Sequence, residues 1–265
     1  MSSAGDELDE LLALMRTLRD PAAGCPWDRE QTFDSIAPFT IEEAYEVADA
    51  IARSDPERLR DELGDLLFQV VFHARMAEEA GSFDFAGVAR AICDKLIRRH
   101  PHIFADRQQL PVAQLHDVWE AQKARERADA GERGVLSGVP RALPALMRAA
   151  KLGRRARRVG FDWDSAAGVR RKIDEELAEI DAALVAGQRG EVALEIGDLL
   201  FTIANWARHL DIDAEAALRA AALKFEQRFE RMEQAAEASQ QALNQLSASQ
   251  WDELWRAAKS LSEKQ

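Results

Sequence analysis

Apolar side chains recur every three or four residues along most of the chain, which is the spacing of one face of an α-helix. Two segments show this most clearly, with apolar side chains at Leu63, Leu66, Leu67, Val70 and Val71 and again at Ile196, Leu199, Leu200, Ile203 and Ala204. No segment alternates convincingly between apolar and polar positions as a half-buried strand does. Ala, Leu, Glu and Arg are abundant, which also favours helices. We therefore predict an all-α fold.

Glycine and proline divide the chain near its middle, at Gly131, Gly134, Gly138, Pro140 and Pro144. Such a concentration is typical of a linker between domains. We predict an N-terminal domain over residues 1–130, a linker over 131–144 and a C-terminal domain over 145–265. A chain of 265 residues that is 47% hydrophobic is large enough to bury two cores.

Two acidic motifs occur twice, with the same spacing of 133 residues between the copies. IEEAYE at 41–46 corresponds to DEELAE at 174–179, and ELGDLLF at 62–68 corresponds to EIGDLLF at 195–201. The breaks between the motifs also correspond, because Asp55-Pro56 separates the first pair and Gly187 to Gly190 the second. We therefore interpret the chain as a tandem duplication of one helical domain.

Each copy is predicted to gather four carboxylates. Residues three or four apart share a helix face, and two antiparallel helices joined by a short turn bring such faces together. Four crowded carboxylates repel one another unless divalent cations lie among them. Oxygen ligands without His or Cys favour Mg²⁺, with Mn²⁺ as a substitute. The predicted metal ligands are Glu43, Glu46, Glu62 and Asp65 in the first copy and Glu176, Glu179, Glu195 and Asp198 in the second.

Two other interpretations of the acidic motifs are less favourable. An acidic cluster is often only a solvated helix face, but these carboxylates lie in helices that are apolar on most other faces and they recur in a second copy. A di-iron centre of the ferritin type needs Glu-x-x-His, and none of the five histidines has a Glu three residues before it.

Composition limits the classes of partner. The formal net charge of −12 and the pI near 5.0 argue against nucleic acid and against anionic membranes. The sequence has no apolar stretch of membrane-spanning length, and its first residues are charged throughout, unlike a signal peptide. Two cysteines, Cys25 and Cys93, suit a reducing compartment. We expect a cytoplasmic protein.

Several segments resemble the MazG family, the tandem-domain nucleoside triphosphate pyrophosphohydrolases of bacteria. They are CPWDREQTFDSIAPFTIEEAYEVADAI, DELGDLLFQVVFHARMA, DKLIRRHPHIFAD and PRALPALMRAAKLGRRARRVGFDW, and the similarity covers nearly the whole chain. The resemblance implies two MazG-type helical bundles, usually in a homodimer. It further implies Mg²⁺-dependent hydrolysis of nucleoside triphosphates to monophosphate and pyrophosphate, with broad base specificity and a role in cleaning nucleotide pools.

The same resemblance assigns roles around the second acidic cluster, which we expect to be the main active site. From the chemistry of the carboxylates we expect Glu175 or Glu176, with Glu42 or Glu43 as counterparts in the first copy, to accept the proton of the attacking water. Asn205 stands where the first copy has Phe72, and Lys172 precedes the acidic motif where the first copy has aromatic and apolar residues. The implied substrate-binding residues are Lys172, Glu175, Asp198, Asn205, Lys224, Arg228, Trp255 and Lys259, and Phe161 and Trp163 are candidates for stacking on the base or for anchoring the domain.

Other functions fit parts of the same pattern. All-α dUTPases and the phosphoribosyl-ATP pyrophosphohydrolase of histidine synthesis resemble the same carboxylate scaffold, although the tandem duplication and the CPWD and GFDW segments favour MazG. A regulatory module that binds nucleotide with little catalysis is the non-enzymatic alternative.

Overall fold

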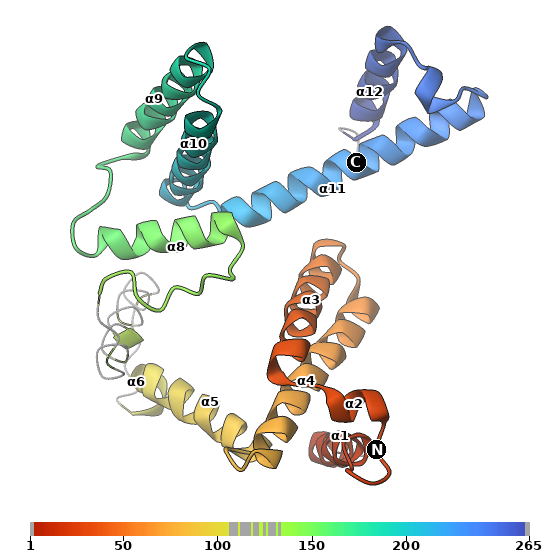
Figure 1. Ribbon diagram of the computed structural model, residues 1–265, viewed down its shortest axis with the longest axis vertical. Coiled ribbons are helices and arrows are strands. Elements are labelled where there is room, and N and C mark those ends of the chain that lie inside the picture. Colours follow the sequence, from red (N-terminus) through yellow and green to blue (C-terminus); the bar gives the residue numbers. More distant parts are fainter. Residues whose placement is uncertain are drawn as a thin grey trace. The chain divides into compact units, whose positions relative to one another are not determined.

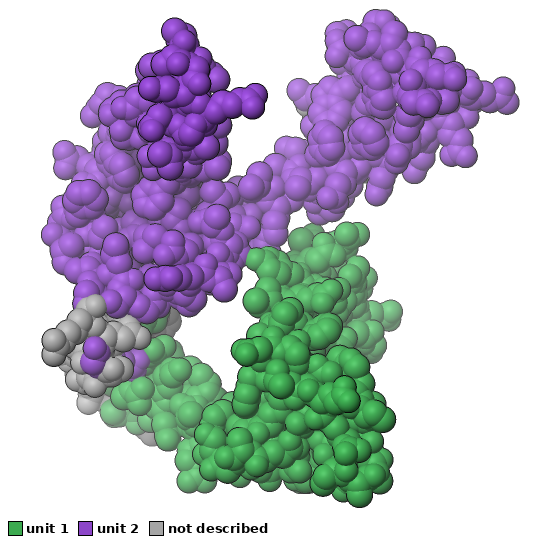
Figure 2. Space-filling view, viewed as in Figure 1, with its two compact units in different colours: residues 1–124 green, residues 125–265 purple. Residues whose placement is uncertain are grey.

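The computed structural model describes residues 3–105, 111, 118, 122–123, 126, 131 and 134–262. Within these ranges every regular element is a helix, so the all-α prediction is confirmed. The chain divides into two compact units, residues 1–124 and 125–265 (Figure 2). No helix of the described part is long and apolar enough to cross a bilayer.

A hairpin of two long helices dominates the first unit (Figure 1). Its helices are α3 (Phe33–Ala52) and α4 (Pro56–Glu79), which pack along each other. The other helices of this unit are α1 (Ala4–Leu18), which packs against α4, α2 (Pro26–Glu30), α5 (Phe85–Arg99), which follows α4 and contacts it, and α6 (Pro101–Phe104), which contacts α5. The core forms where α1 meets the hairpin, so the opposite end of α3 and α4 is available for chemistry.

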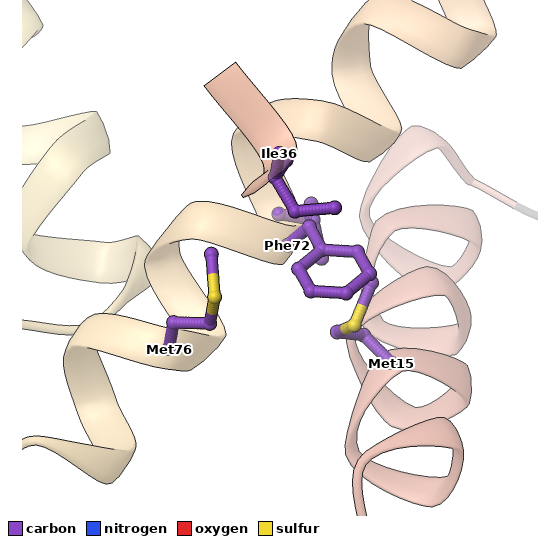
Figure 3. Close-up of a cluster of buried hydrophobic side chains, with 5 residues drawn as sticks. Met15, Ile36, Phe72 and Met76 are labelled. Carbon is purple, nitrogen blue, oxygen red and sulfur yellow. The ribbon is translucent and has the colours of Figure 1, made fainter. Parts of the chain in front are cut away.

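Five buried side chains make up this core (Figure 3). Met15 comes from α1, Ile36 from α3, and Val71, Phe72 and Met76 from α4. Phe72 is completely buried, and its ring lies 5.3 Å from the Arg19 guanidinium carbon. Of the apolar stripe predicted on α4, Val71 lies in this core, whereas Leu63 and Leu67 remain exposed.

The second unit repeats the hairpin and adds a long arm (Figure 1). Helices α9 (Ala166–Val185) and α10 (Arg189–His209) form the hairpin, and α8 (Ala145–Arg157) packs on α10. The arm is α11 (Ala214–Ala238), followed by a 3₁₀ turn (Leu243–Gln245) and by α12 (Ala248–Ser262), which packs against α11. Both ends of α9 lie 133 residues after those of α3, so the duplication extends to the helix bounds.

The turn inside each hairpin needs one residue in the left-handed conformation. Gly187 has φ 68° in the second hairpin, and Ser54, at the equivalent position of the first, has φ 57°. Asp55 then caps α4 by accepting a hydrogen bond from the backbone nitrogen of Arg58 at 3.0 Å, and Pro56 occupies the first helical turn. The turn, the cap and the proline together align the acidic ends of α3 and α4.

The end of the predicted linker packs on the second unit. Val139 is buried, and the Arg155 guanidinium donates to the backbone carbonyls of Ser137 and Gly138. These contacts bring residues 137–139 onto α8.

Candidate active site

Three carboxylates of the second unit converge between α9 and α10. Glu176 and Glu179 lie one turn apart on α9, and Glu195 faces them from α10. Each offers an oxygen that lies within 4.8 Å of an oxygen of the other two. Glu176 is buried, with 3% of its surface exposed, whereas Glu179 is open to solvent. This arrangement is the convergence predicted from the helical spacing and the short turn.

Asp198 lies outside this triangle but adds to its charge. It is exposed, one turn after Glu195 on α10. Burial and the negative charges of Glu179, Glu176 and Asp198, in that order, raise the pKa of Glu195. The rise in pKa means that ionised Glu195 is disfavoured where no cation compensates.

Lys172 brings a cation from the same helix to the carboxylates. Its Nζ lies 2.6 Å from Glu175 Oε1, 2.9 Å from Glu176 Oε1 and 3.8 Å from Glu179 Oε2. The hydrogen bonds to Glu175 and Glu176 raise the pKa of Lys172. Lys172 thus bridges two of the triangle's carboxylates and the exposed Glu175.

The first unit gathers an equivalent set. Oxygens of Glu43, Glu62 and Asp65 lie within 4.8 Å of one another. Burial, followed by the charge of Asp65 and of the other nearby glutamates, raises the pKa of Glu43. Glu46 shares a hydrogen bond with Glu62 that raises the pKa of Glu46. A raised pKa is the expected result of crowding like charges.

A different basic side chain, that of Arg58, pairs with this first set of carboxylates. Arg58 donates from Nε to Glu62 Oε1 at 3.0 Å and lies 3.7 Å from Asp49. Arg58 was missed by the sequence analysis, although an Arg four residues before a Glu on one helix is a recognisable pairing signal.

Both sets fit a divalent cation. Three hard oxygen donors at mutual distances below 4.8 Å match the ligand type that Mg²⁺ and Mn²⁺ prefer. Burial and, after it, the neighbouring carboxylates raise the pKa of Glu43 and of Glu195, so a further positive charge would stabilise their ionised forms. A bound cation would supply that charge.

Asn205, a predicted substrate contact, has its side chain engaged inside the second unit. It is completely buried, where α8 crosses α10, and a Cβ built on Gly153 would come within 1.8 Å of its Oδ1. Its amide nitrogen donates to the Phe201 carbonyl and its Oδ1 accepts from Arg208 Nε, both at 3.0 Å. The difference between Asn205 and Phe72 is therefore one of packing in two different cores.

Asp162 of the GFDW segment anchors a loop onto α10. It accepts hydrogen bonds from both terminal nitrogens of Arg208, at 2.6 and 3.0 Å, and lies 3.0 Å from His209 Nε2. Burial raises the pKa of Asp162, but the hydrogen bonds from Arg208 and His209 outweigh this effect and lower the pKa to about 2. Trp163 packs edge-on against His209, at 6.4 Å between ring centres, so it serves as an anchor of the domain, whereas Phe161 is 79% exposed.

The remaining predicted substrate contacts form a separate group on α11 and α12. Arg228 lies over the Trp255 ring, 5.6 Å from its centre, and Phe225 also contacts this ring at 5.7 Å. Lys224 and Lys259 are exposed on the same two helices. Among the residues that the structure describes, no hydrogen bond or ion pair joins this group to the carboxylates of α9 and α10.

Comparisons with known proteins match both halves of the chain. The profile of the MazG nucleotide pyrophosphohydrolase domain matches residues 31–104, and that of phosphoribosyl-ATP pyrophosphohydrolase matches residues 150–225. Each match covers one hairpin and its acidic cluster.

Full-length relatives extend the similarity over the whole chain. The nucleoside triphosphate pyrophosphohydrolase of Escherichia coli (strain K12) is 47% identical over 256 residues, covering 96% of this chain and 97% of the relative. The nucleoside triphosphate pyrophosphohydrolase/pyrophosphatase MazG of Thermotoga maritima is 42% identical over 260 residues, covering 98% of both chains. With the duplicated hairpins and their carboxylate clusters, these matches establish that the chain belongs to the MazG family of nucleotide pyrophosphohydrolases.

Proposed function

We propose that the protein hydrolyses nucleoside triphosphates to the monophosphate and pyrophosphate, with Mg²⁺, at the α9–α10 cluster. The observation that carries this proposal is the triangle of Glu176, Glu179 and Glu195 with Lys172 beside it. The names of the full-length relatives support the substrate class. Mn²⁺ is expected to substitute for Mg²⁺ because both accept oxygen ligands.

Cleavage of a phosphoanhydride depends mainly on positioning and on neutralising charge. When bound, the metal would supply charge neutralisation and lower the pKa of a coordinated water. Glu176, Glu179 and Glu195 would hold it, with Asp198 adding negative charge at the open side. Glu176 is the most buried of these residues, so it is the most rigidly held candidate ligand.

The proton of the attacking water needs an acceptor that is free of the metal. Glu175 is better suited to this role than Glu176, because its side chain is 59% exposed and lies outside the triangle. Lys172 Nζ lies 2.6 Å from Glu175 Oε1. We therefore propose Glu175 as the general base and Glu176 as a ligand.

Binding of the triphosphate needs cations. Lys172 is one, and Lys224, Arg228 and Lys259 are further proposed contacts, with Trp255 beside the base. The last four of these residues lie on α11 and α12. For them to contact the substrate, this arm and the carboxylates of α9 and α10 must lie around the same nucleotide.

We assign the main activity to the second unit because the two clusters differ in their cation. Lys172 contacts two carboxylates of its set and Glu175 beside them, whereas the equivalent position of the first copy is Phe39. Arg58 contacts one carboxylate of the first set, from the other helix of the hairpin. The first cluster therefore lacks the lysine that α9 supplies to the second.

Two matched variants test this assignment. Glu179→Gln is expected to lower pyrophosphate release by about 10²–10³-fold, the usual effect of removing one preorganised electrostatic contact. Glu46→Gln, the equivalent change in the first copy, is expected to leave most of the activity. If only Glu46→Gln abolished pyrophosphate release, the roles of the two units would be reversed.

A narrower activity is the second candidate, because the phosphoribosyl-ATP pyrophosphohydrolase profile matches the catalytic half. We propose broad base specificity and a role in cleaning nucleotide pools, as the full-length relatives are named for nucleoside triphosphates. Rates with all standard triphosphates, dUTP, phosphoribosyl-ATP and several damaged triphosphates separate the candidates. Nucleotide binding with no pyrophosphate release from any of them would favour a regulatory module.

We also propose a cytoplasmic homodimer. Cys25 and Cys93 are free thiols, which suits a reducing compartment. Leu184 on α9 and Ile196 and Leu200 on α10 are large apolar side chains that the unit leaves exposed. Pairing with a second copy would remove such surface from water.

A further inference from the structure

We propose that Lys172 is a resident counter-ion that competes with the metal for the α9–α10 carboxylates and leaves them when Mg²⁺ binds. The proposal rests on the proposed function, and it concerns how metal and substrate binding are ordered at that site. It assigns Lys172 two states, one on the carboxylates and one free to meet an anionic ligand.

The contacts of Lys172 define the first state. Its Nζ is 2.9 Å from Glu176 and 3.8 Å from Glu179, two of the three carboxylates that could hold a cation. The ammonium therefore competes for the oxygens that the metal would use. A lysine ammonium is a compact point charge on a flexible stem, which suits a cation that has to move.

The first unit supports the argument independently. Arg58 occupies the same electrostatic role there, 3.0 Å from Glu62. With the spacing of 133 residues between copies, Lys172 corresponds to Phe39 and Arg58 corresponds to Glu191. The two resident cations thus stand at non-equivalent positions and even on non-equivalent helices. What the units share is the requirement to balance a carboxylate cluster, because like charges crowded together are costly.

Release of Lys172 would link the metal to the substrate. While Lys172 is paired with glutamates, its charge is already balanced and attracts a triphosphate weakly. Once it leaves them, an unpaired ammonium stands beside the site and can bind a phosphate oxygen. By linkage, pairing of Lys172 with the glutamates must weaken metal binding by the same factor by which bound metal weakens that pairing.

The test measures Mn²⁺ binding by calorimetry, without nucleotide, in the full-length protein. Glu43→Gln and Asp65→Asn are included throughout, so that binding at the first cluster is suppressed. Lys172→Met, which keeps the length of the stem, is expected to raise the affinity for Mn²⁺ about 5- to 10-fold. It is also expected to lower the melting temperature without metal, and the difference from the parent should shrink at saturating Mn²⁺. Lys172→Gln provides a second variant should Lys172→Met fold poorly.

Arg170→Met is the matched control. It removes the same charge from the same helix, but Arg170 pairs with Asp174 and not with the cluster. Its Mn²⁺ affinity is expected to stay close to that of the parent. Equal gains in Mn²⁺ affinity in both variants would show that the effect comes from the net charge of the helix alone, which would overturn the proposal. A Mn²⁺ affinity of Lys172→Met that is unchanged or weaker than that of the parent would also overturn it. If Glu176→Gln left Mn²⁺ binding unchanged, the proposed metal site itself would fail, which is a different result.

Discussion

At the scale of single residues, equivalent buried positions of the two units carry different side chains. Phe72 and Asn205 are equivalent in the duplication and both are completely buried. Phe72 packs against Met15 and Ile36, whereas Asn205 is held by Arg208 and fits against Gly153, where any Cβ would clash with it. A polar residue at this position of a duplicated helix predicted a substrate contact, and the structure shows that its amide forms hydrogen bonds inside the unit.

Asp162 leads to a prediction about acid stability. The pKa of Asp162 is lowered from 3.8 to about 2. Its interactions with Arg208 and His209 therefore contribute fully to the free energy of unfolding above pH 3.8, and this contribution is lost as the pH falls through about 2. Asp162→Asn is expected to lower the free energy of unfolding at pH 7 by about 3 kcal/mol, the usual cost of breaking a buried ion pair. The difference between the two proteins should narrow between pH 4 and pH 2.

Urea unfolding followed by circular dichroism at several pH values measures this difference. Comparison of variant with parent cancels the titration of the other carboxylates. A difference that stays constant down to pH 2 would contradict the assigned pKa.

At the scale of elements, the hairpin turn depends on one left-handed residue. Ser54 adopts φ 57° at the position where the second copy has Gly187. Glycine adopts this conformation without steric cost, whereas for other residues the conformation costs about 1 kcal/mol. Ser54→Gly is therefore expected to raise the free energy of unfolding by about 0.5–1 kcal/mol.

The reciprocal variant is the control for this turn. Gly187→Ser is expected to destabilise by about 1 kcal/mol, because it introduces the strain that Ser54 carries. Chemical denaturation of both variants provides the comparison. Loss of stability in Ser54→Gly would show that the serine side chain contributes more than its backbone costs.

The helices themselves could largely be predicted from the sequence. The apolar spacing and the breaks at Asp55-Pro56 and Gly187 to Gly190 indicated the hairpins, because helix periodicity and turn residues are local properties. The contacts between Arg155 and residues 137–138 were not predictable, because they join a segment interpreted as linker to the side of α8.

At the scale of the whole molecule, equivalent apolar side chains of both units are exposed. Leu63 and Leu67 on α4 correspond to Ile196 and Leu200 on α10, and all four are more than 40% exposed. Because burial of apolar surface drives association, the full-length protein is expected to have twice the 29.6 kDa chain mass in solution.

A pair of charges placed on this surface tests the homodimer. Leu184→Glu with Leu200→Glu is expected to shift the mass measured by light scattering after size exclusion toward that of a single chain. Val159→Glu, at an exposed apolar position in the loop between α8 and α9, is expected to leave the mass unchanged. A parent protein with the mass of one chain would refute the homodimer.

The acidity of the chain also acquires a different meaning at this scale. The net charge of −12 argues against polyanionic partners, yet eight of the 47 acidic residues form the two predicted metal-ligand sets. An acidic protein can bind a small triphosphate where the metal and a few local cations balance the charge.

The sequence by itself determined the all-α class, the duplication and the two helices in each copy that carry the acidic residues, because periodicity, turn residues and motif spacing are properties of the chain read in order. Only the tertiary structure decided that Asn205 belongs to a core, that Asp162 anchors the GFDW loop, and that Lys172 and Arg58 neutralise their clusters from different helices. These outcomes depend on which helix faces pack together and on how much water they exclude, and that information exists only once the chain has folded.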